Sequence, residues 1–237
     1  MSPALGSLVG VSFALYLRAI YLGPEWQVYL FKPLTTILIL SGAVLTARRQ
    51  PKGSEGARYG RLICVGLLCS LAGDVLLMLP RDRFVAGLGA FLLAHVCYIG
   101  AFSSPAGPRA TWRVGIPYVV LLAVLLLLLL PHVGGLRLPA TVYGAALVGM
   151  AWQAAERWHA ARGSGPAAAA AGGALFIASD AALAVDRFVA PFHAASLVIM
   201  GTYVLAQWLI AASAGRVHPG LRLRRQHDRA EVVQSPR

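Results

Sequence analysis

Charged residues are scarce in this 237-residue chain and are confined to short stretches between long apolar runs. They make up 13% of the chain, acidic residues number only nine, and 58% of all residues are hydrophobic. The mean hydropathy is +0.67. This composition is typical of a polytopic helical membrane protein, and it leaves no room for a separate soluble domain.

Cysteine is also rare, and all three cysteines, Cys64, Cys69 and Cys97, stand inside apolar segments. An odd number without metal-ligand spacing excludes a disulfide framework and favours small packing residues. The sequence lacks a G-x-S-x-G elbow, an H-E-x-x-H helix and a glycine-rich phosphate loop. These absences leave no competing mechanism of serine, zinc or nucleotide type.

The apolar runs predict an all-α bundle of about eight transmembrane helices, because a span needs about 20 mostly apolar residues. The expected spans cover residues 3–22, 27–47, 60–79, 84–103, 112–131, 138–158, 166–185 and 189–213. Short connections predict one domain over residues 1–215. Residues 216–237 form a basic tail that is expected to be disordered.

Two of these apolar runs carry specific expectations about packing. The alanine- and glycine-rich start of the seventh span should lie inside the bundle, because small residues let helix backbones approach closely. The leucine run 121–131 has no pattern of its own and is expected to face lipid.

The net charge of +12 does not indicate nucleic acid, because the basic residues are partitioned by loop rather than gathered in one patch. Most lie in the second, fourth and sixth connections and in the tail, and the opposite connections hold Arg81, Arg83, Arg137 and Arg187. The positive-inside rule therefore predicts that both termini are cytoplasmic. The excess of arginine over lysine and the abundant alanine favour a bacterial plasma membrane.

Two aspartates, Asp74 and Asp180, stand inside otherwise lipid-compatible spans. An acid within a span is costly and marks a functional site by default, although a single one is sometimes only a packing device. Lys32 and Tyr143 are expected at the same depth, about 8 Å below the non-cytoplasmic surface at ~1.5 Å per residue. Four polar groups from four spans would therefore form one layer.

Further polar residues are expected deeper in the membrane. His95 with Tyr98, and Tyr203 with Gln207, are spaced so that each pair shares a helix face. Together with the aspartates they predict a cavity that opens toward the non-cytoplasmic side. Each has a structural alternative, since histidine, tyrosine and glutamine also serve as interhelical hydrogen-bonding groups.

The chain also carries a weak parallel internal repeat. Gly73-Asp74 with Asp82-Arg83-Phe84 is echoed by Ser179-Asp180 with Asp186-Arg187-Phe188, and each copy precedes a span that carries a tyrosine. Parallel repeats occur in some transporters. Asp82 and Asp186 are most simply solvated ion pairs or helix caps, while Ser179 and Asp186 also remain candidates for supporting the site.

Two carboxyl groups that face one cavity can take different protonation states, because burial favours the neutral form and a nearby lysine favours the ionised one. One acid and one base suit hydrolysis through an oxocarbenium-like intermediate, as in glycoside hydrolysis.

Six motifs in order resemble the lysoplasmalogenase (YhhN-like) family of eight-span membrane proteins. They are Lys32-Pro33, A-G-D ending at Asp74, A-F-L-L-A-H-V-C-Y-I-G-A-F from Ala90, L-P-A-T-V-Y-G from Leu138, L-F-I-A-S-D-A-A-L-A-V-D-R-F from Leu175 and T-Y-V-L-A-Q from Thr202. The resemblance implies hydrolysis of the vinyl-ether bond of lysoplasmalogens to a fatty aldehyde and a glycerophospho-headgroup, and this chemistry needs no metal ion and no organic cofactor. It implies a lysophospholipid substrate taken from the membrane.

On this interpretation Asp74 and Asp180 are the acid and the base, without a decision on which is which. The supporting residues would orient water, tune the acids or hold the headgroup; they are Lys32, His95, Tyr98, Tyr143, Ser179, Asp186, Tyr203 and Gln207. The alternatives are a proton-coupled transporter of a lipid or small amphiphile that uses the same aspartates, and a non-catalytic membrane scaffold. The sequence leaves the oligomeric state open.

Overall fold

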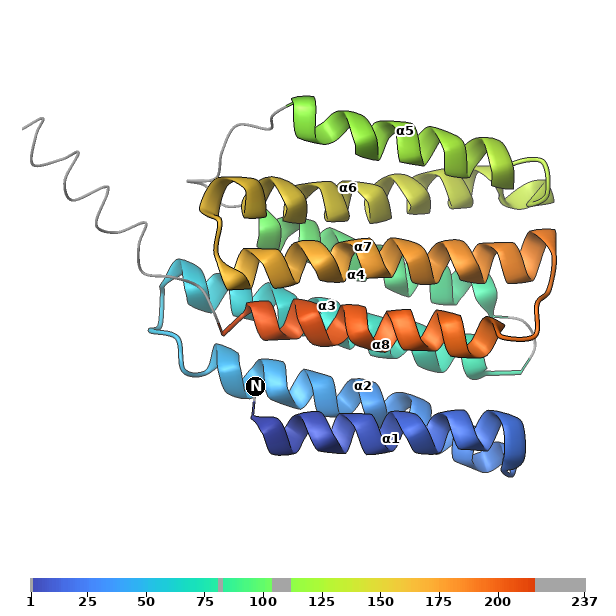
Figure 1. Cartoon of the computed structure of the whole chain (residues 1–237), viewed down its shortest axis with the longest axis horizontal. Coiled ribbons are helices and arrows are strands. Elements are labelled where there is room, and N and C mark those ends of the chain that lie inside the picture. Colours follow the sequence, from blue (N-terminus) through green and yellow to red (C-terminus); the bar gives the residue numbers. More distant parts are fainter. Residues whose placement is uncertain (1, 81–82, 104–111, 216–237) are drawn as a thin grey trace, which may run out of the picture.

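The computed structural model describes residues 2–80, 83–103 and 112–215. The predicted tail, residues 216–237, and Asp82 lie outside the described residues. In the described part, eight long helices run up and down in succession, so that the first helix begins and the last one ends at the same end of the bundle (Figure 1). The predicted all-α class with about eight helices is confirmed.

Eight α-helices and two short helical turns make up the described fold. The α-helices are α1 (Pro3–Leu22), α2 (Glu25–Ala47), α3 (Glu55–Met78), α4 (Phe84–Phe102), α5 (Trp112–Leu129), α6 (Arg137–Ala161), α7 (Ser164–Ala184) and α8 (Ala195–Ser213). The turns are η1 (Gly134–Leu136), a 3₁₀ turn before α6, and η2 (Val185–Val189), a π-helical turn after α7.

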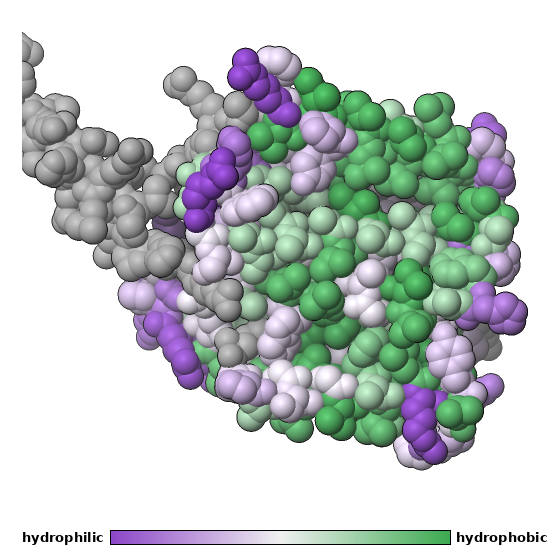
Figure 2. Space-filling model, in the orientation of Figure 1, coloured by the Kyte–Doolittle hydropathy of each residue, from purple (hydrophilic) through white to green (hydrophobic). Residues whose placement is uncertain are grey.

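Most of these helices match the thickness of a bilayer. Among the described residues, seven are long and apolar enough to cross a membrane, and α6 is the exception. Its 25 residues are long enough, but Glu156 and Arg157 lower the hydropathy of its second half. Hydrophobic side chains cover much of the middle of the face in Figure 2, with hydrophilic ones near both ends of the helices. The chain is an integral multi-pass membrane protein.

The helix ends follow from local sequence. The hydroxyls of Ser2 and Ser54 accept hydrogen bonds from the first turns of α1 and α3, as N-cap serines do. The eighth span was expected from residue 189, and this boundary is wrong, because α8 begins at Ala195. The π-turn η2 continues α7 to Val189, and Pro191, which has no N–H, follows before the chain turns back.

Helix α7 lies inside the bundle, as its small residues predict. It runs between α6 and α8 in Figure 1, and most of its residues from 165 to 173 are buried. A Cβ atom added at Gly172 would lie 2.8 Å from Ile210 of α8, and one added at Gly173 would lie 3.0 Å from the backbone of Ala151 of α6. Glycine at both positions is therefore what allows the three helices to pack this closely.

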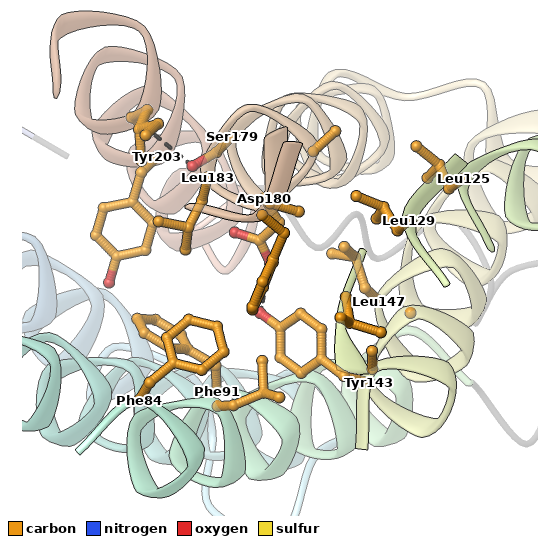
Figure 3. Close-up of a pocket in the computed structure, with 18 of the residues that line it drawn as sticks. Phe84, Phe91, Leu125, Leu129, Tyr143, Leu147, Ser179, Asp180, Leu183 and Tyr203 are labelled. Carbon is orange, nitrogen blue, oxygen red and sulfur yellow. Dashed lines mark hydrogen bonds between the residues drawn. The ribbon is translucent and has the colours of Figure 1, made fainter. Parts of the chain in front are cut away.

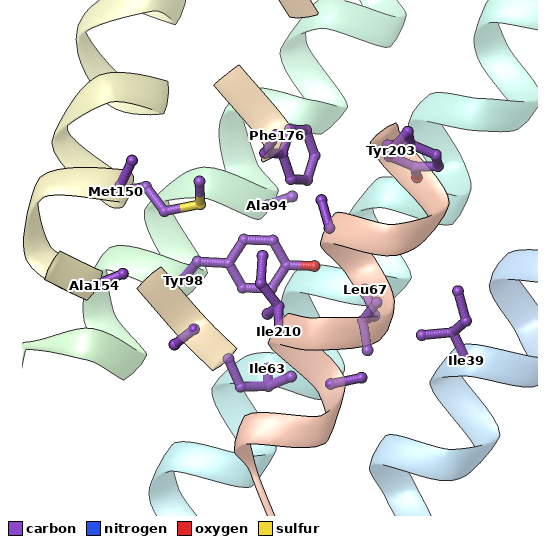
Figure 4. Packing of buried hydrophobic residues seen from close by; sticks show 14 of the residues in the cluster. Ile39, Ile63, Leu67, Ala94, Tyr98, Met150, Ala154, Phe176, Tyr203 and Ile210 are labelled. Atoms are coloured by element: carbon purple, nitrogen blue, oxygen red, sulfur yellow. The ribbon is translucent and has the colours of Figure 1, made fainter. Parts of the chain in front are cut away.

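A dense apolar core fills the half of the bundle nearer the described termini. Tyr98 of α4 lies among Ile63 of α3, Met150 of α6 and Ile210 of α8 (Figure 4), and all four side chains are almost fully buried. On α3 the core residue Ile63 precedes Asp74 by three helical turns, and α3 begins at the end where the termini lie. The core therefore closes the bundle on the side of the termini.

The weak repeat corresponds to two helical hairpins, α3–α4 and α7–α8. Their first helices run in the same direction (Figure 1). Asp74 and Asp180 each stand four residues before the last residue of their helix, Met78 and Ala184. Both aspartates therefore lie near the end of the bundle at which α3 and α7 end.

Candidate active site

A cavity of about 150 Å³ lies near the end of the bundle opposite the termini. Its walls come from α2 to α8 and the two short turns, and almost all of them are apolar. The polar residues that line it are Lys32, Asp74, Tyr143, Ser179, Asp180 and Tyr203. In Figure 3 the side chain of Asp180 points at the hydroxyl of Tyr143, and Phe84 and Phe91 lie across the cavity from Ser179 and Leu183. Such a cavity suits a ligand with a long apolar part and a small polar centre.

Asp74 is held by three donors. Its carboxylate is 2% exposed, and its Oδ2 accepts hydrogen bonds from the Thr36 and Tyr203 hydroxyls, each at 2.8 Å. The Lys32 Nζ lies 3.7 Å from Oδ1. Lys32 and Thr36 are one turn apart on α2, so the same helix face presents both to α3. A buried carboxylate with an ammonium group and two hydroxyl donors is arranged to carry a negative charge.

A chain of hydrogen bonds leads from Asp74 into the core. Gln207 Nε2 donates to the Tyr203 hydroxyl at 3.2 Å, and the Tyr98 hydroxyl donates to Gln207 Oε1 at 2.8 Å. Tyr98 and Gln207 are fully buried and do not line the cavity. They orient the Tyr203 hydroxyl toward Asp74, because Gln207 occupies the acceptor side of that oxygen.

Asp180 has a simpler environment. The Tyr143 hydroxyl of α6 donates a short hydrogen bond to Asp180 Oδ2. Among the described residues, Tyr143 is the sole donor to this carboxyl group, and no ammonium or guanidinium group pairs with it. Asp180 is half-buried at the cavity wall, whereas Asp74 is buried. A carboxyl group with one neutral donor and no cation is arranged to hold a proton.

The other predicted site residues lie at or outside the edge of this arrangement. Ser179 lines the cavity, but its hydroxyl donates to the Ile199 carbonyl at 3.0 Å. His95 is fully buried behind Tyr143, with ring centres 5.1 Å apart, and neither ring nitrogen has a hydrogen-bond partner in the described structure. Asp186 does not line the cavity, and its Oδ1 accepts the N–H of Phe192, in the loop that leads into α8, at 3.2 Å.

The structure also shows residues at the site that the sequence interpretation missed, one beside Asp74 and several in the cavity wall. Thr36 follows Lys32 by one helical turn, and that spacing was the available signal. The leucine run was expected to face lipid only, and this is wrong for one face of α5, because Leu122, Leu125, Leu126 and Leu129 line the cavity. Their spacing is that of one helix face, but a run of identical residues carries no periodicity by which to find it.

The fold and the cavity define a class: an integral membrane helical bundle with two aspartates in different surroundings at a largely apolar cavity. The chain belongs to the YhhN family, whose pattern matches residues 27–214.

Relatives of known name support this assignment. An Escherichia coli O6:H1 protein, "Uncharacterized membrane protein YhhN", is 33% identical over 213 residues, which cover 88% of this chain and 98% of that protein. The human "Lysoplasmalogenase TMEM86B" is 39% identical over 168 residues, covering 69% of this chain and 67% of the relative. A Mycobacterium bovis "Lysoplasmalogenase" is 35% identical over 195 residues, covering 77% and 68%. No solved structure matches the chain.

Proposed function

We propose that this chain hydrolyses the vinyl-ether bond of lysoplasmalogens by aspartate general acid and base catalysis. The observation that carries the proposal is the pair of aspartates at one apolar cavity, one beside a lysine and two hydroxyls and the other beside a single tyrosine. The names of the human and Mycobacterium relatives support the substrate class.

In the proposed reaction Asp180 is the acid. Its proton goes to the β-carbon of the vinyl ether, and the ether oxygen stabilises the resulting cation as an oxocarbenium ion. Tyr143, bonded to Oδ2, leaves Oδ1 as the oxygen that carries this proton. General acid catalysis of this kind is worth about 10²- to 10⁴-fold in rate.

Asp74 is then the base. As a carboxylate it takes a proton from the water that attacks the oxocarbenium carbon, which gives a hemiacetal. When the hemiacetal collapses, the Asp180 carboxylate takes the hydroxyl proton and Asp74 returns its proton to the departing glycerol oxygen. The products are a fatty aldehyde and the glycerophospho-headgroup, and both aspartates regain their starting protonation states.

The apolar wall of the cavity offers a binding surface for the alkenyl chain of the substrate. The leucine face of α5 and Leu147 of α6 line the cavity opposite the α4 phenylalanines, and they offer a surface for the alkenyl chain. Substrate, intermediate and aldehyde are all lipids, so a site that is reached within the bilayer suits each of them.

The decisive experiment measures aldehyde release by purified protein in detergent, in heavy water. The substrates are a lysoplasmalogen and the matched acyl-ester and alkyl-ether lysophospholipids. We expect aldehyde from the vinyl ether alone, with one deuterium on its α-carbon, because the proton is added to carbon. No aldehyde from folded protein, or aldehyde without deuterium at that carbon, would refute the proposed chemistry.

The transporter alternative receives no support from the relatives whose names state an activity, since those are named as hydrolases. We also propose that both termini are cytoplasmic and that the chain resides in a bacterial plasma membrane. The support for the orientation is the basic residues of the second and sixth connections, at the end where α1 begins and α8 ends. The support for a bacterial membrane is the excess of arginine over lysine and the abundant alanine. A cysteine introduced at Ser2 should then react with a membrane-impermeant thiol reagent only in permeabilised cells.

A further inference from the structure

A tyrosine hydroxyl in the apolar core is held in place by the packing of its ring. The fully buried ring of Tyr98 lies among apolar side chains (Figure 4). A Cβ atom added at Gly66 of α3 would overlap this ring, so glycine at that position makes room for it. Phe102 stacks on the same ring, with ring centres 6.3 Å apart. The Tyr98 hydroxyl therefore has a fixed place beside Gln207 of α8, although neither residue lines the cavity.

This hydroxyl sets the orientation of the Gln207 amide. The Tyr98 hydroxyl donates to Gln207 Oε1 at 2.8 Å, and Gln207 is fully buried. An amide presents an acceptor oxygen on one side and a donor nitrogen on the other. With its oxygen facing Tyr98, Gln207 turns Nε2 to Tyr203 and donates to the hydroxyl oxygen there at 3.2 Å. The Tyr203 hydrogen then goes to its other partner, Asp74 Oδ2, at 2.8 Å.

The three hydrogen bonds all donate in one direction, from α4 through α8 to α3, and a carboxylate can only accept. If the Gln207 amide turned over, Nε2 would donate to Tyr98 and Oε1 would accept the hydrogen of Tyr203. Asp74 would then lose one of its donors. The donor at the far end of the chain, Tyr98, therefore decides whether Tyr203 donates to Asp74.

The same chain distinguishes the two oxygens of Asp74. Oδ2 accepts from the hydroxyls of Tyr203 and Thr36, each at 2.8 Å, and these two bonds occupy it. Oδ1 faces the Lys32 Nζ at 3.7 Å, which is beyond hydrogen-bond distance. Oδ1 therefore keeps more capacity to accept a proton than Oδ2.

We propose that Tyr98 and Gln207 are positioning residues that act on Asp74 through Tyr203. They hold Oδ2 as the fixed oxygen and leave Oδ1 to take the proton of the attacking water. In that step the water oxygen bonds to the oxocarbenium carbon, one water O–H bond breaks, and its proton goes to Oδ1. This role in the reaction rests on the proposed function, whereas the directed chain is a property of the resting protein that is measurable without turnover.

The first test measures kcat and KM for aldehyde release by Tyr98→Phe and Gln207→Leu. We expect kcat to fall about tenfold in each, because Asp74 loses its orientation, while KM stays unchanged because neither residue lines the cavity. Gln207→Leu keeps the test valid if Tyr98→Phe does not fold. The matched control is Tyr59→Phe, which removes another buried hydroxyl, 2.6 Å from that of Ser213, and should change neither constant.

A double-mutant cycle separates positioning from a merely structural role. Once Tyr203→Phe has removed the hydroxyl that Tyr98 acts through, Tyr98→Phe should lower kcat no further. Additive losses would show that Tyr98 acts through packing alone, and an unchanged kcat in folded Tyr98→Phe or Gln207→Leu would show no action on Asp74. Either result overturns the proposal.

The second test is infrared spectroscopy of the substrate-free protein with ¹³C-labelled aspartate side chains. The carboxylate stretching band should shift in Tyr98→Phe and Gln207→Leu but not in Tyr59→Phe. The shift should vanish when Tyr98→Phe is combined with Asp74→Asn. Absence of a shift in the two single variants would overturn the directed chain, even with aldehyde release intact. A shift in a protein whose wild type releases no aldehyde would refute only the proposed hydrolysis.

Discussion

The hairpins α3–α4 and α7–α8 each place an aspartate near the end of their first helix, but the two aspartates have different surroundings. Asp74 and Asp180 occupy the same position relative to the end of their helix. Asp74 meets an ammonium group and two hydroxyls, whereas Asp180 meets one tyrosine. A repeated pattern therefore fixes where a carboxyl group stands, and its neighbours fix which charge it carries.

Most of those neighbours come from outside the repeat. Lys32 and Thr36 belong to α2, and Tyr143 belongs to α6. Only Tyr203, on α8, comes from within the hairpins. Helices that the repeat does not contain thus give two equivalent positions different surroundings, and in the proposed mechanism these surroundings make one aspartate the acid and the other the base. This division of roles is open to mutational tests at each neighbour.

The largest expected effect is at the proposed acid. Asp180→Asn should lower kcat about 10³-fold, because an amide cannot give a proton to carbon and a positioned acid is worth about 10²- to 10⁴-fold. Aldehyde release from the lysoplasmalogen measures it. Glu25→Gln, which removes an exposed carboxylate at the start of α2, is the matched control and should leave the rate unchanged. A folded Asp180→Asn protein with full activity would remove Asp180 from the mechanism.

The next effect distinguishes the base from the acid. Asp74→Ala should lower kcat about 10²- to 10³-fold, and formate should restore part of the loss, because a small carboxylate in the emptied space can accept the proton of the attacking water. Asp180→Ala should gain nothing from formate, since formate is ionised at neutral pH and has no proton to give. Rescue of Asp180→Ala but not of Asp74→Ala would reverse the two roles.

The third test removes the ammonium group of Lys32, which lies beside Asp74 but not beside Asp180. Lys32→Met should lower kcat about 10- to 100-fold, because Asp74 then loses the charge that keeps it ionised, and breaking a buried pair costs about 3–5 kcal/mol of stability. In a double-mutant cycle, Lys32→Met should add little to Asp74→Asn, since both act on the same group. Lys52→Met, in an exposed loop, is the control. Additive losses would show that Lys32 acts elsewhere.

Much of the fold was predictable because each expected helix is an apolar run bounded by charged or turn-forming residues. The start of α8 was placed six residues too early, since hydropathy alone does not separate the π-turn η2 and the loop after it from the helix that follows. The shared position of Asp74 and Asp180 could also be seen, because helical rise converts sequence distance into depth.

The pairing within the site could not be predicted from the sequence. Depth places Tyr143 level with both aspartates, but only the packing of α6 against α7 decides that it bonds Asp180. Nothing in the sequence distinguishes Thr36 from other threonines in apolar spans, because its role depends on the position of Asp74 on the neighbouring helix α3. His95 was expected to share the site with Tyr98, yet the packing of α4 leaves its ring behind Tyr143. Neighbour relations between helices are absent from the periodicity of any one of them.

The smallest effect in the series concerns the single donor of Asp180. Tyr143→Phe keeps the ring that lines the cavity and removes the hydroxyl that bonds Oδ2. We expect kcat to fall about tenfold with little change in KM, because the acid loses its orientation while the apolar wall stays in place. Tyr29→Phe, an exposed tyrosine of α2, serves as the control. If Tyr143→Phe raised KM and left kcat unchanged, Tyr143 would bind the substrate rather than orient the acid, and the contrast between the two aspartates would then rest on the donors around Asp74.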